Sequence, residues 1–126
     1  MSYSIHVYPI ELLNKTISEN MDFHEVLEYI EKEQNLLPFS AEQMTLIEDH
    51  LDYRGFKLER KSLNRKDYSH PKFSSISAMV TPAGVYFDAR GEDVLDMTLT
   101  AGEFGYSGSL KGEFGVFDSG NGGWQK

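Results

Sequence analysis

A glycine-aromatic unit near the C-terminal end of the sequence occurs twice. Gly102-Glu103-Phe104-Gly105 returns ten residues later as Gly112-Glu113-Phe114-Gly115, and eight of the eleven glycines lie between Gly102 and Gly123. Because glycine lacks a Cβ atom, such a segment can adopt positive φ angles and turn sharply between its large side chains. We predict that its aromatic residues either form a partner-binding surface or seal the core of the chain. These predicted binding residues are Phe104, Tyr106, Phe114, Phe117 and Trp124.

The first half of the sequence predicts one strand and two helices. Apolar residues alternate with polar ones over residues 3–8, which is typical of a half-buried strand, and an irregular stretch follows over residues 10–21. Asp22 then begins a helix with a capping box, and apolar residues recur at helical spacing as far as Ile30. A second helix is predicted over residues 41–53, with Met44, Ile47 and Leu51 on its buried face.

After the second helix the spacing of the apolar residues changes from about 3.6 residues, which is typical of a helix, to 2 residues, which is typical of a strand. It predicts a strand that starts at Phe56 and runs into a basic stretch, a hairpin over residues 74–90, and a further strand over residues 95–101. Strands that follow one another without intervening helices favour an antiparallel meander. We therefore predict a single α+β domain over residues 1–126, in the order β-α-α-β-β-β-β. Its sheet has about five strands, both helices pack on one face, and the glycine-aromatic tail finishes an edge or covers a sheet end.

The net charge of −8 is unevenly distributed. Residues 1–56 carry a balance of −8, residues 57–72 a balance of +4, and residues 73–126 a balance of −4. The strongly negative field opposes long-range attraction to nucleic acid, so we expect no nucleic-acid partner. A basic protein is the partner that this charge favours.

Several classes of protein are disfavoured by what the sequence lacks. Without cysteine there are no disulfides and no thiolate metal sites, and the four histidines are scattered, so we expect no metal ion and no cofactor. No apolar run approaches the roughly 18 residues that span a bilayer, and the N-terminus does not resemble a signal peptide. We therefore expect a cytoplasmic location without membrane association.

One group of acids allows an enzymatic interpretation. Four of them cluster around the glycine at position 91, and paired carboxylates can perform acid–base chemistry when one is desolvated. They are Asp88, Glu92, Asp93 and Asp96. Acids beside a turn more often serve solubility and capping, and we predict no catalytic residue here.

Four short segments of the sequence carry a family resemblance. They are Tyr3-Ser4-Ile5-His6-Val7-Tyr8, Tyr53-Arg54-Gly55-Phe56, the stretch from Met97 to Phe104, and Asn121-Gly122-Gly123-Trp124, and together they resemble small uncharacterised bacterial proteins of similar length. That group implies no activity, so no functional residue is transferred from it.

Our leading hypothesis for the function is a non-enzymatic, acidic protein-binding module. Its size and charge resemble those of immunity proteins, which neutralise a basic toxin by covering its active site. The alternatives are a carboxylate-based hydrolase with the acids around Gly91 at its centre, and a structural homodimer joined through a sheet edge or the tail.

Overall fold

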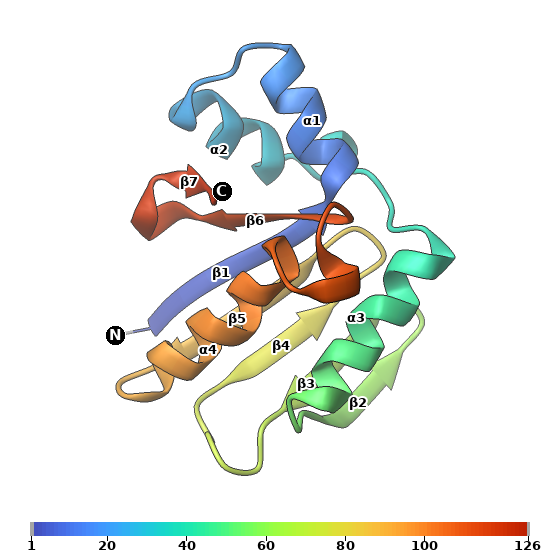
Figure 1. Cartoon of the computed structure of the whole chain (residues 1–126), viewed down its shortest axis with the longest axis vertical. Coiled ribbons are helices and arrows are strands. Elements are labelled where there is room, and N and C mark those ends of the chain that lie inside the picture. The colour runs from blue at the N-terminus through green and yellow to red at the C-terminus, as the bar shows by residue number, and fades with distance from the viewer. Residues whose placement is uncertain (1, 126) are drawn as a thin grey trace.

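The computed structural model of the chain, which describes residues 2–125, is built on an antiparallel sheet (Figure 1). Over these residues the sheet has seven strands in the spatial order β2-β3-β4-β5-β1-β6-β7, so β1 lies between β5 and β6. The strands are β1 (Ser2–Pro9), β2 (Lys57–Ser62), β3 (Arg65–Ser69), β4 (Ser77–Val80), β5 (Val85–Arg90), β6 (Phe114–Asp118) and β7 (Gly123–Trp124).

Four α-helices occur within the described residues, and they cover both faces of the sheet. They are α1 (Ile10–Ser18), α2 (Phe23–Glu31), α3 (Ala41–Tyr53) and α4 (Asp93–Gly102). Short 3-10 turns also occur: η1 (Glu33–Asn35), η2 (Glu103–Gly105), η3 (Gly108–Leu110) and η4 (Ser119–Asn121). The predicted α+β class is confirmed, whereas the predicted numbers of about five strands and two helices were too low.

Neighbouring residues of β1 explain why helices are needed on both faces. Val7 points into the main core, which α3 and α4 cover, whereas Tyr8 belongs to a second cluster with residues of α1 and α2. Successive side chains of a strand point to opposite faces, so two apolar neighbours require a cover on each side. The prediction that both helices share one face was therefore wrong, since α2 and α3 lie on opposite faces.

Residues 10–21 were expected to be irregular, but α1 occupies most of this segment. Its buried residues are Leu12 and Thr16, one helical turn apart. Because Thr16 is polar, the buried face of α1 does not appear in the sequence as a run of apolar residues at helical spacing. Its hydroxyl can be buried because it donates to the Leu13 carbonyl at 2.8 Å and accepts from the Trp124 indole at 2.9 Å.

Residues 95–101 were expected to form a strand, and this was wrong because they belong to α4. The apolar residues whose alternation predicted this strand do not share one face, because some of them are buried and others are exposed. Met97, Thr100 and Ala101 are buried with the following Phe104, at the spacing of one helix face. Leu95 and Leu99 instead face solvent.

The basic stretch differs from expectation in its strands, whereas the tail lies at a sheet edge as expected. The strand expected after Phe56 is the β2–β3 hairpin, whereas the hairpin over residues 74–90 is confirmed as β4–β5. The tail finishes an edge of the sheet, as expected. Its first strand, β6, pairs with β1, and its second strand, β7, pairs with β6 and is the outermost strand on that side.

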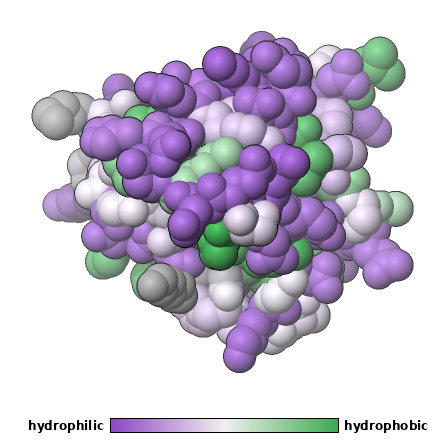
Figure 2. Space-filling view, turned by 90° about the horizontal axis from the view of Figure 1, so that it is seen from above, coloured by the Kyte–Doolittle hydropathy of each residue, from purple (hydrophilic) through white to green (hydrophobic). Residues whose placement is uncertain are grey.

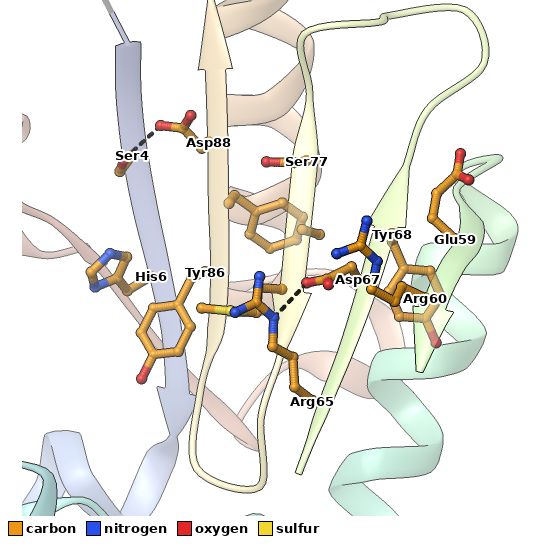
Figure 3. Close-up of a pocket in the computed structure, with 13 residues that line it drawn as sticks. Ser4, His6, Glu59, Arg60, Arg65, Asp67, Tyr68, Ser77, Tyr86 and Asp88 are labelled. Atoms are coloured by element: carbon orange, nitrogen blue, oxygen red, sulfur yellow. Dashed lines mark hydrogen bonds and ion pairs between the residues drawn. The ribbon is translucent and has the colours of Figure 1, made fainter. Parts of the chain in front are cut away.

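The α1–α2 layer leaves part of its sheet face uncovered. These helices contact β6, β7 and the C-terminal part of β1, whereas the same face of β2, β3, β4 and β5 carries polar side chains that line an open groove (Figure 3). Viewed from above, the end that carries α1 and α2 is mostly hydrophilic (Figure 2). Within residues 2–125, no helix is both long and apolar enough to cross a bilayer.

Candidate functional site

The five predicted binding residues do not form one surface. Phe104, Phe114 and Phe117 are buried, and the first two meet edge to face with ring centroids 5.2 Å apart in the main core. Trp124 is half-buried, and its ring packs edge to face against Phe117 on the other side of the sheet. Tyr106 is 61% exposed. Burial of the three phenylalanines favours the role in which the tail seals the core. Of the five predicted binding residues, Tyr106 is the one that a partner protein reaches most easily.

Three further exposed apolar side chains lie on the same side of the sheet as Tyr106, the side that α3 and α4 cover. Tyr53, at the end of α3, is 81% exposed, and Leu95 and Leu99 lie one turn apart on α4 with exposures of 68% and 46%. The Tyr106 ring lies beside the C-terminal end of α4, because a Cβ atom added at Gly102 would be 3.9 Å from it. We call Tyr53, Leu95, Leu99 and Tyr106 the tyrosine surface.

An ion pair between Arg54 and Glu103 joins the ends of α3 and α4 beside the tyrosine surface. Arg54 Nε donates to Glu103 Oε1 at 2.7 Å, and a second Arg54 nitrogen donates to Glu103 Oε2. The hydrogen bonds to Glu103 are the main reason that the pKa of the Arg54 guanidinium is raised, and the nearby Tyr53 and Tyr106 contribute to the rise. Because Arg54 follows α3 and Glu103 follows α4, the pair joins the ends of these two helices, near which Tyr53 and Tyr106 lie.

A buried histidine, His50, adds further contacts between α3 and the end of α4. His50 Nε2 is 3.2 Å from both the Thr100 carbonyl and Glu103 Oε1, and its ring packs edge to face on Phe104. Burial is the main effect on its pKa and lowers it, so the neutral ring predominates at pH 7. Since both neighbours of Nε2 are acceptors, we assign the proton to Nε2. The imidazole therefore acts as a structural donor between α3 and the end of α4.

The charge around the tyrosine surface is negative. Asp49 and Asp52 lie on the exposed side of α3, and Asp96 lies on α4. Over residues 2–125, none of these three carboxylates takes part in an ion pair, whereas the neighbouring Arg54 is paired with Glu103. The surface thus combines exposed aromatic area with uncompensated negative charge.

The acids around Gly91 are placed in different settings. Asp88 lies on the uncovered face of β5, where it accepts a hydrogen bond from Ser4 at 2.9 Å. Asp93 begins α4, on the opposite face, and accepts from the Ser75 hydroxyl at 2.7 Å and the Ser75 amide at 3.0 Å. These bonds lower the pKa of Asp93. The structure therefore does not bring these two carboxylates together as an acid–base pair.

The sequence analysis missed Tyr53, Leu95 and Leu99 as surface residues. Both leucines fall in the segment predicted to be a strand over residues 95–101, and Tyr53 has no local signal beyond its position at the end of a predicted helix. Within residues 2–125, no group of three histidine, aspartate or glutamate side chains is placed to hold a metal ion.

Comparisons with protein-family models, with curated proteins and with solved structures found no match to this chain. The resemblance to small bacterial proteins therefore stays a prediction.

Proposed function

We propose that this protein is a non-enzymatic protein-binding module that engages a basic protein partner through the tyrosine surface. The observation that carries this proposal is the pair of exposed tyrosines, Tyr53 and Tyr106, held beside the Arg54–Glu103 ion pair and surrounded by unpaired carboxylates. Tyrosine is enriched among the residues that dominate binding energy at protein interfaces.

The Arg54–Glu103 ion pair supports binding because it holds the ends of α3 and α4 together before a partner arrives. Backbone segments that are already positioned lose less conformational freedom when a partner covers them. Arg54 and Glu103 also neutralise each other, so covering them does not bury an unpaired charge. The free energy of binding then comes mainly from the area of the tyrosine and leucine side chains.

The carboxylates would select the partner. Asp49, Asp52 and Asp96 present negative charge around an aromatic centre, which speeds the association of a basic protein and disfavours acidic ones. This arrangement fits an immunity-type role, in which the module covers the active site of a basic toxin. We propose that role as the specific form of the binding function.

The test is co-expression with the products of the neighbouring genes. We expect one product to be basic and toxic alone, and to be neutralised by the wild-type module, with which it co-purifies. Tyr53→Ala and Tyr106→Ala should each weaken this complex at least tenfold, as expected for binding hot spots. Ile17→Ala is the matched control, since Ile17 is 62% exposed on the distant α1 and should not matter.

The alternatives give different results in the same experiments. If the module binds no neighbouring product and instead sediments as a dimer that Tyr53→Ala dissociates, the surface joins two copies of the chain. Pairing through the β2 edge is disfavoured, because its three cations and the bulge between Leu58 and Arg60 oppose edge-to-edge association.

A further inference from the structure

The uncovered sheet face, on the side opposite the tyrosine surface, contains a groove with a deeper cavity beside α2. The groove has a volume of about 490 Å³ and the cavity about 210 Å³. Ser4, His6 and Tyr86 line both, so the two spaces adjoin. Figure 3 shows these three side chains where they line the groove. The cavity is closed on its other sides by Leu27 and Ile30 of α2 and by aromatic residues of the sheet.

Three rings in the cavity wall stand nearly perpendicular to one another, and we call His6, Tyr8 and Tyr86 the aromatic corner. The ring centroids of His6 and Tyr86 are 4.7 Å apart at 85°, those of Tyr8 and Tyr86 6.1 Å apart at 80°, and those of His6 and Tyr8 6.0 Å apart at 80°. The sheet register creates this arrangement, because His6 pairs directly with Tyr86 and lies two residues before Tyr8 on the same face.

The aromatic corner is neutral, and carboxylates lie beside it. Burial lowers the pKa of His6 and raises the pKa values of Tyr8 and Tyr86, so all three rings are uncharged at pH 7. Tyr8 is only 2% exposed, so the rings that a ligand can touch are those of His6 and Tyr86. Glu31 lines the cavity, and Glu33 lies close enough to contribute to the raised pKa of Tyr86. The cations Arg60 and Arg65 line the adjoining groove and not the cavity, and Arg65 is paired with Asp67.

We infer that this cavity binds an organic cation, either a guanidinium or ammonium group on a polypeptide side chain or a free quaternary ammonium compound. Aromatic rings attract such cations through the negative potential of their faces, and several rings around one site are the usual way to recognise quaternary ammonium groups. Glu31 and Glu33 supply the charge complementarity, and they repel anionic ligands. The inference is independent of the proposed function, because the sheet separates the cavity from the tyrosine surface.

The experiment uses small cations and their neutral isosteres on the whole chain. Choline is compared with 3,3-dimethylbutanol, and N-acetylarginine amide is compared with N-acetylcitrulline amide. Binding is measured by calorimetry and by the NMR shifts of the His6 ring protons. We expect at least one cation to bind at least tenfold more tightly than its isostere and to shift the His6 signals. The stronger of the two cations identifies the source, free quaternary ammonium or side-chain guanidinium.

Substitutions distinguish the contribution of the Tyr86 ring from that of its hydroxyl group and from effects on folding. Tyr86→Leu should lower cation affinity at least fivefold, Glu31→Gln should lower it less, and Tyr86→Phe should preserve it, because the phenyl ring remains. Tyr53→Leu, on the opposite side of the sheet, is the matched control and should have no effect. The inference is overturned if neither cation binds at millimolar concentration, if the isosteres bind equally well, or if a folded Tyr86→Leu protein retains full affinity.

Discussion

The hydroxyl of Tyr3 donates a 2.6 Å hydrogen bond to the carboxylate of Asp118, a residue 115 positions away in the sequence. Tyr3 lies on the central strand β1, and Asp118 is the buried last residue of β6. The Gly120 amide donates to the same carboxylate oxygen at 3.1 Å. This pair makes the tail an integral part of the fold.

We expect Tyr3→Phe to lower the free energy of unfolding by about 1–3 kcal/mol at pH 7, because the buried carboxylate of Asp118 loses a donor. The bond also raises the pKa of Tyr3 to about 12. A phenol whose pKa is higher in the folded state stabilises fully below its unfolded pKa, and this contribution is lost as the pH rises from about 10 to about 12. Urea unfolding across this range should show a steeper decline for the wild type than for Tyr3→Phe, and equal slopes would contradict the assignment.

The two copies of the glycine-aromatic unit have different structures, which a pair of matched substitutions tests. A Cβ atom at Gly115 would lie 2.9 Å from Leu13 Cβ and 3.0 Å from the Trp124 ring, whereas one at Gly105 would meet only Val116 at 3.5 Å. We expect Gly115→Ala to cost about 1–3 kcal/mol through overpacking and Gly105→Ala to cost less than about 0.5 kcal/mol. Thermal unfolding of both variants measures the difference, and similar losses would mean that the copies are equivalent.

The buried face of α3 gives a further prediction. Leu51 is fully buried in the main core, so Leu51→Ala should lower the free energy of unfolding by about 2–5 kcal/mol through lost burial and a cavity. Leu95→Ala, at an exposed position of α4, is the control and should stay within about 0.5 kcal/mol of the wild type. A loss below about 1 kcal/mol for Leu51→Ala, with an unchanged m-value, would show that this face is not packed.

Local signals in the sequence were sufficient where the helix ends have strong caps. The capping boxes at Asp22 and Ser40 are both present, and α3 spans Ala41–Tyr53 as predicted. The signals failed where burial is decided by distant partners. Thr16 is buried because the indole of Trp124 reaches it, and Leu95 and Leu99 are exposed because α4 turns its other side to the sheet.

The candidate surfaces could not be predicted for the same reason. The ends of α3 and α4, near which Tyr53 and Tyr106 lie, are joined by an ion pair between residues 49 positions apart. The aromatic corner depends on the register of β1 against β5, which pairs His6 with Tyr86. No local pattern encodes either relationship.

The sealing role of the tail is tested at its tryptophan. The Trp124 indole donates to Thr16 Oγ1 at 2.9 Å and packs edge to face on Tyr8 and Phe117. We expect Trp124→Ala to cost about 3 kcal/mol and Thr16→Val, which removes the hydrogen-bond partner at similar volume, about 1 kcal/mol. The fluorescence of the wild type should be blue-shifted and protected from quenchers. A red-shifted, quenchable emission together with unchanged stability of Trp124→Ala would favour a recognition role instead.

Stability should fall as the solution becomes mildly acidic, because His6 and His50 both have lowered pKa values in the folded state, chiefly through burial. Near and below the unfolded value of about 6.5, the unfolded chain binds protons that the folded chain does not, so each histidine favours unfolding increasingly as the pH drops. Their contribution is absent well above pH 6.5 and stops growing once the pH falls below the folded pKa. We expect the urea midpoint to decrease between pH 7.5 and pH 5.5. His6→Gln and His50→Gln should each remove part of that decrease, and the double variant should remove most of it. An unchanged slope in the double variant would show that other groups cause the pH dependence.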